Sequence, residues 1–139
     1  MKIGSLRRLL AGLAAGDSLG STSEFVPQKD IPHLYEKEKN KGWPFRQVGG
    51  GLAGWSPGDP TDDTEMTLCM VTSYLQEDKF DPCSIARQFV SWMKQGPIHI
   101  GTTTIRSLSA VQKGREYWEG GYGFWRERPN FASNGSLMR

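Results

Sequence analysis

The chain has 139 residues, a length that fits one domain of ordinary size with a single hydrophobic core. Its 17 lysines and arginines against 15 aspartates and glutamates give a net charge of +2. A charge so small and so evenly spread argues against a nucleic-acid-binding or membrane-surface protein. No apolar run approaches the roughly 20 residues that cross a bilayer. The two cysteines, Cys69 and Cys83, lack the spacing of a zinc site and are expected to be free thiols, so a reducing cytoplasm is the simplest expectation.

The first segment has an amphipathic helical pattern, because apolar residues recur at three- and four-residue steps. These residues are Leu6, Leu9, Leu10, Leu13 and Ala14. From Val26 to Pro60 the chain is rich in proline, glycine and charged residues, which indicates a loop. That loop allows one short helix near Pro32 to Lys39.

Three further segments combine a helix-start signal with an apolar stripe. They run from Thr61 or Asp62 to Leu75, from Asp81-Pro82 to Gly96, and from Thr102 to Lys113. The glycine- and aromatic-rich stretch from Trp118 to Trp125 is predicted to be a flexible loop, although its rings could also face a nucleobase. No segment shows strand alternation or a hairpin turn pair. The sequence therefore predicts an all-α fold.

The sharpest local feature is Thr61-Asp62-Asp63-Thr64, directly after a loop and before a helix. Mg2+ and Mn2+ prefer carboxylate and hydroxyl oxygens, and two adjacent aspartates beside a threonine supply several of them from one turn. The same residue types are also the usual helix caps, with acids favoured there by the helix dipole. Residue types alone leave both interpretations open.

Two more carboxylates stand out around the end of the first helix. Asp17 interrupts an apolar pattern, and a buried acid is costly unless it is paired or hydrogen-bonded. It either caps the amides of a neighbouring loop or points toward a polar site. Glu24 follows Gly20 on a loop, where it could transfer a proton within a cleft or be a solvated surface acid.

The carboxyl-terminal half offers polar groups suited to phosphate or sugar. His99 lies just before a helix start with three threonines, Thr102 to Thr104, whose amides and hydroxyls could cradle a phosphate or simply cap the helix. The final residues, 133–139, combine small residues with hydrogen-bond donors, so they could contact sugar or phosphate oxygens or form a tight turn.

The order of these motifs resembles that of the ADP-ribosylglycohydrolases. The motifs are Gly-Asp-x-x-Gly with a glutamate four residues on, Thr-Asp-Asp-Thr, Ile-Gly-x-Thr-Thr, and Asn-Gly-Ser-Leu-Met-Arg. The resemblance extends from residue 13 to residue 139. It implies a compact, multi-helix orthogonal bundle, of which residues 1–139 would form the amino-terminal part of a single domain.

The resemblance also implies a hydrolase that cleaves the N- or O-glycosidic bond between ADP-ribose and a modified protein side chain or nucleotide. Two Mg2+ or Mn2+ ions would serve as cofactors, with Thr61, Asp62 and Asp63 as metal ligands. Asp62, Asp63 and Glu24 would act in catalysis, Glu24 as the mobile acid beside the scissile bond with Asp17 supporting it. The residues expected to bind ADP-ribose are Asp17, His99, Gly101, Thr102, Asn134, Gly135 and Ser136.

Two departures from the family pattern matter. A bacterial member has an aspartate where this chain has His99 and an asparagine where it has Thr102, which implies a different substrate or a weaker enzyme. Family members also continue into a second acidic motif, Asp-x-Asp-Ser/Thr, so we expect a truncated chain that needs a complementary carboxy-terminal half or self-associates. The alternatives are a non-catalytic remnant that binds an ADP-ribose-like ligand or a protein partner, and a plain helical interaction domain whose acids only cap.

Overall fold

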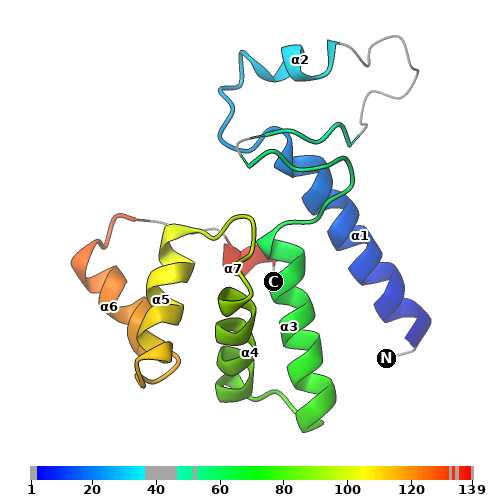
Figure 1. Ribbon diagram of the computed structural model, residues 1–139. Coiled ribbons are helices and arrows are strands. Elements are labelled where there is room, and N and C mark those ends of the chain that lie inside the picture. Colours follow the sequence, from blue (N-terminus) through cyan, green and yellow to red (C-terminus); the bar gives the residue numbers. More distant parts are fainter. Residues whose placement is uncertain (1–2, 37–46, 52, 132, 134, 139) are drawn as a thin grey trace. The chain divides into compact units, whose positions relative to one another are not determined.

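The computed structural model describes residues 3–36, 47–51, 53–131, 133 and 135–138. In these residues the regular secondary structure is helical, so the predicted all-α class is confirmed (Figure 1). The helices of this part of the chain include none that is both long and apolar enough to span a membrane. The chain divides into two compact units, Met1–Thr64 and Glu65–Arg139.

The first unit is built on α1, Ile3–Ser21, which extends the predicted first helix at both ends. The short helix expected near Pro32 to Lys39 is α2, Ile31–Leu34; residues 37–39 of that range lie outside the described residues.

The loop after α2 returns to the carboxyl-terminal half of α1. Gln47 Nε2 donates a hydrogen bond to the carbonyl oxygen of Ala15 at 3.2 Å. Gly51 has φ +64°, and a Cβ there would lie 2.4 Å from the carbonyl oxygen of Ser21. Only glycine tolerates both the left-handed backbone and this close approach. The loop is therefore held against α1 at two positions by its own residues.

Three further predicted helices are confirmed, and nearly all of their residues belong to the second unit. They are α3, Asp62–Glu77, which starts at the end of the first unit; α4, Pro82–Lys94; and α5, Thr102–Gln112. Asp81 caps α4 as expected, since its side chain accepts hydrogen bonds from the amides of Cys83 and Ser84. These hydrogen bonds hold the pKa of the Asp81 carboxyl below its usual value, and the bond from the Ser84 amide has the larger effect.

The core of the second unit takes one large side chain from each of these helices. Met66 of α3, Trp92 of α4 and Leu108 of α5 are buried together. The Trp92 indole Nε1 donates a 2.6 Å hydrogen bond to Glu65 Oε2, which joins the start of α3 to the end of α4. Burial of this apolar cluster is the main stabilising contribution to the helix packing.

The prediction of a loop over Trp118 to Trp125 was wrong. Residues Glu119–Glu127 form α6, and a short helix, α7, follows at Gly135–Met138. Helix α6 packs closely on α5 at Gly120, where a Cβ would lie 2.6 Å from the carbonyl oxygen of Ser107. Phe124 of α6 is buried, and the guanidinium of Arg106 on α5 lies 5.1 Å from the centre of its ring. Tertiary packing thus overrides the low intrinsic helix propensity of the glycines.

We predict that Gly120→Ala destabilises the protein by about 1–3 kcal/mol, because the added methyl group meets the α5 backbone. The matched control is Gly123→Ala on the same helix, where an added Cβ meets no heavy atom within 4 Å. That control should be neutral or stabilising by up to about 1 kcal/mol, since alanine is the better helix former. Urea unfolding of both variants tests this, and equal effects would contradict the close α5–α6 contact.

Candidate functional site

One aspartate connects α1 with the start of α3. Asp17 Oδ2 accepts hydrogen bonds from the backbone amides of Thr61, at 2.8 Å, and Thr64, at 3.1 Å. The Thr61 hydroxyl donates to Asp17 Oδ1 at 2.6 Å, and the Thr64 hydroxyl donates to Asp17 Oδ2 at 2.5 Å. We call this arrangement of Asp17, Thr61 and Thr64 the Asp17 clasp. It links residues that are 44 and 47 positions apart in the sequence.

The clasp joins the start of a helix, whose first amides lack acceptors, to a partly buried acid, which needs donors. The first amides of a helix have no acceptor within that helix, and the positive end of its dipole favours a carboxylate. Thr61 and Thr64 are only 6% and 5% exposed, so their polar groups need partners inside the protein. Of the two expectations for Asp17, the structure shows that this side chain caps the amides of a neighbouring segment.

Asp62 and Asp63 are both partly buried and occupy the first turn of α3. Thr61 Oγ1 accepts a long hydrogen bond, 3.4 Å, from the amide of Asp63. The side chain of Asp17 thus accepts from the amides of Thr61 and Thr64, and the hydroxyl oxygen of Thr61 accepts from the amide of Asp63. The clasp fixes the turn that carries the two aspartates, while their role as metal ligands stays a prediction.

In the part of the chain that the structure describes, no three histidine, cysteine, aspartate or glutamate side chains gather closely enough to form a metal site. The Thr61–Asp63 segment contributes two carboxylates and one hydroxyl to the turn. All of these donors are oxygens, the type that Mg2+ and Mn2+ prefer.

Glu24 lies in the same unit, on the turn that follows α1, and is exposed. The turn is closed by hydrogen bonds from the amide of Ser23 to the Gly20 carbonyl, at 3.0 Å, and from the amide of Val26 to the Ser23 carbonyl, at 3.1 Å. Phe25 next to it adopts φ 61°, a left-handed conformation that is uncommon for an aromatic residue. The backbone around Glu24 is therefore constrained rather than extended.

The remaining predicted site residues belong to the second unit. His99 is partly buried in the loop before α5, Gly101 precedes that helix and Thr102 begins it. Gly135 is buried at the start of α7, which also contains Ser136, whereas Asn134 lies outside the described residues. Their expected roles in binding ADP-ribose remain predictions.

A cavity in the second unit borders two of the predicted ligand-binding segments. It has a volume of about 510 Å³ and is mostly apolar. Thr103 and Thr104 of α5 line it, as does Ser133 just before the Asn-Gly-Ser segment. The start of α5 and the approach to α7 therefore open onto one hollow.

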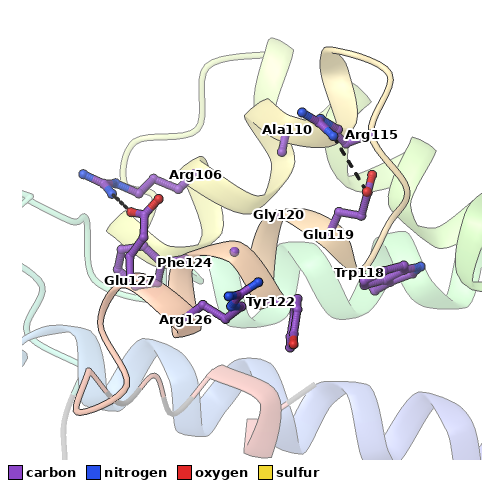
Figure 2. A pocket seen from close by; sticks show the side chains of 11 residues that line it. Arg106, Ala110, Arg115, Trp118, Glu119, Gly120, Tyr122, Phe124, Arg126 and Glu127 are labelled. Atoms are coloured by element: carbon purple, nitrogen blue, oxygen red, sulfur yellow. Dashed lines mark ion pairs between the residues drawn. The ribbon is translucent and has the colours of Figure 1, made fainter.

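A second hollow, also of about 510 Å³, follows the seam between α5 and α6 (Figure 2). Ion pairs lie at its edges, Arg106 with Glu127 and Arg115 with the half-buried Glu119, each at 3.8 Å. Two aromatic residues line it, Trp118 just before α6 and Tyr122 on α6; they are 52% and 50% exposed, so both rings lie at the surface. None of the predicted catalytic or metal-binding residues lines this groove.

The sequence analysis included Thr64 in its sharpest motif but gave it no role of its own, and it did not predict the pair formed by Glu65 and Trp92. Glu65 directly follows the acidic turn, and its carboxylate bonds to Trp92 on α4. Burial raises the pKa of the Cys69 thiol on the same helix, and the charge of Glu65 raises it further. One signal was present for Thr64, because a helix-start threonine is a natural donor for an unpaired acid.

A sequence profile of the ADP-ribosylglycohydrolase family matches residues 4–139 of this chain. The chain belongs to the ADP-ribosylglycohydrolase family. The resemblance inferred from the four motifs is therefore confirmed.

Two curated relatives illustrate what the chain is similar to. The chain is 34% identical over 137 residues to the ADP-ribosylarginine hydrolase Tri1 of Pseudomonas putida (strain GB-1), covering 94% of this chain and 33% of the relative. It is 34% identical over 128 residues to the ADP-ribosyl-(dinitrogen reductase) glycohydrolase of Rhodospirillum rubrum, covering 92% of this chain and 40% of the relative. The chain thus spans between a third and two fifths of their lengths.

The clasp yields a stability prediction. Asp17→Asn replaces one accepting oxygen by an amide nitrogen that faces the donors of Thr61 and Thr64, so we expect a loss of about 2–4 kcal/mol in the free energy of unfolding. Asp59→Asn makes the same chemical change at a loop carboxylate that accepts one hydrogen bond, from the Ser56 amide at 2.9 Å. That control should cost no more than about 1 kcal/mol. Equal losses in urea unfolding would mean that the clasp contributes little.

Proposed function

We propose that this chain carries part of the catalytic site of a metal-dependent hydrolase that cleaves the glycosidic bond between ADP-ribose and a modified protein side chain. Family membership and the names of the two relatives support this proposal. The structural observation that carries it is the Asp17 clasp, because it holds the turn of Asp62 and Asp63 in one conformation.

The potential ligand atoms of this turn are all oxygens, the element that hard divalent cations such as Mg2+ prefer. Mg2+ is commonly bound through one or two carboxylates and keeps several waters or substrate oxygens, so an all-protein cage is not required. Thr61, Asp62 and Asp63 would supply that share of the coordination. When bound, Mg2+ or Mn2+ would orient and polarise the oxygens of the ribose and of the attacking water.

The protein's own groups would divide the remaining work. Glu24 would handle the proton beside the scissile bond, since its constrained turn presents an exposed carboxyl group. Departure of the side chain from the ribose develops positive charge on the sugar, and carboxylates in the site would stabilise that charge. Asp17 is occupied by its four hydrogen bonds, so we assign it to support rather than to direct contact with the sugar.

Within the second unit, several groups have a chemistry suited to a nucleotide. The start of α5 at Gly101 and Thr102 offers helix amides, which favour phosphate. We retain His99, Gly101, Thr102, Asn134, Gly135 and Ser136 as the proposed contacts. The substrate that we would test first is an arginine-linked ADP-ribosyl protein, the linkage that the name of the Pseudomonas relative specifies.

A non-catalytic role is the second candidate. The described residues contain no group of three or more histidine, cysteine, aspartate or glutamate side chains placed to hold a metal. In that role the chain would bind an ADP-ribose-like ligand or a protein partner without turnover.

The activity test measures ADP-ribose released from an ADP-ribosylarginine protein by this chain together with the carboxy-terminal part of one of the longer relatives, with Mg2+, with Mn2+ and with a chelator. We expect ADP-ribose release to depend on the metal. Each of the variants Asp62→Asn, Asp63→Asn and Glu24→Gln should lower the rate of release by about 100-fold or more. Asp59→Asn, a carboxylate outside the proposed site, should keep wild-type activity.

Two outcomes would contradict the hydrolase proposal. ADP-ribose release that a chelator does not change would contradict the metal dependence. Release that Asp62→Asn and Asp63→Asn do not change would contradict the role of the acidic turn. Binding of ADP-ribose, measured by calorimetry, without any release would support the non-catalytic role instead.

A further inference from the structure

The Asp17 clasp does more than cap a helix, because it also fixes the direction of a hydroxyl hydrogen. A threonine hydroxyl has one hydrogen to donate and two lone pairs that can accept. At Thr61 the hydrogen goes to Asp17 Oδ1 at 2.6 Å, a short bond typical of a charged acceptor. One lone pair receives the long, 3.4 Å bond from the amide of Asp63.

Thr61 Oγ1 therefore presents only electron pairs to any further partner. A group that itself offers lone pairs would be repelled there, whereas a cation would be attracted. A ligand oxygen whose hydrogen is donated to a carboxylate also becomes a better electron donor. Residues that accept hydrogen bonds from metal ligands generally have this effect.

We propose that Asp17 is a positioning residue that acts through Thr61, turning its hydroxyl into an oriented, electron-rich ligand for a divalent cation bound at the Asp62–Asp63 turn. This inference rests on the proposed function, since it takes Thr61, Asp62 and Asp63 as the ligand set. It adds that the carboxylate of Asp17 tunes the cation site without touching the cation.

Thr64 provides an internal comparison. Its hydroxyl donates to the same carboxylate, and it is as deeply buried as Thr61. It lies after the aspartates, one step further into α3, and the proposed ligand set does not include it. A purely structural clasp would depend on Thr61 and Thr64 alike, whereas the proposed role depends on Thr61.

The test is a calorimetric titration of the full chain with Mn2+ alone, with unfolding measured in parallel. We expect Asp17→Asn and Thr61→Val to weaken Mn2+ binding by about 10–100-fold. Thr61→Ser keeps the hydroxyl and should bind within about twofold of wild type, as should Thr64→Val, which removes a bond to Asp17 but no ligand. The double variant Asp17→Asn/Thr61→Val should bind no more weakly than Thr61→Val, because the hydroxyl through which Asp17 acts is gone.

Several results would overturn the inference while the proposed function stands. These are wild-type affinity in Asp17→Asn, a loss in Thr64→Val as large as in Asp17→Asn, or a further loss when Asp17→Asn is added to Thr61→Val. If Asp17→Asn does not fold, Asp17→Glu replaces it, since it keeps the charge but displaces the oxygens. No Mn2+ binding by the wild-type chain would instead contradict the metal-dependent function itself.

Discussion

A single carboxylate that accepts four hydrogen bonds is the interaction on which the site depends. Asp17 satisfies the amides and hydroxyls of Thr61 and Thr64, which would otherwise be buried without partners. The acid also gains from the threonines, because removing part of a carboxylate from water is costly unless hydrogen bonds replace the lost hydration. This mutual dependence explains why an aspartate follows the apolar residues of α1, and it gives the acidic turn between the threonines a fixed shape.

The helices that the sequence predicted are those whose signals are local. Apolar periodicity identified α1, α3, α4 and α5, and the Asp81-Pro82 cap located the start of α4 to the residue. Helix α6 was missed because its glycines and aromatic rings are typical of a loop. What makes it a helix is the close approach of Gly120 to Ser107, a contact between distant segments that no local pattern contains.

The site shows the same division between local and non-local information. Motif order indicated the family and named the acidic turn, and the family is confirmed. The pairing of Asp17 with residues 44 and 47 positions away was open, because an acid of this kind has many potential donors. The bond between Glu65 and Trp92 was missed for the same reason, since neither residue carries a signal of its partner. Residue types thus indicated the chemistry, and the fold selected the partners.

A crystal structure of the chain grown with Mn2+, with the ion located by its anomalous scattering, tests the central claim most directly. We expect an ion in contact with Thr61 Oγ1 and with the carboxylates of Asp62 and Asp63, while Asp17 keeps its hydrogen bonds to both threonines. An ion bound elsewhere, or one coordinated by Asp17 itself with the Thr61 hydroxyl turned away, would contradict it.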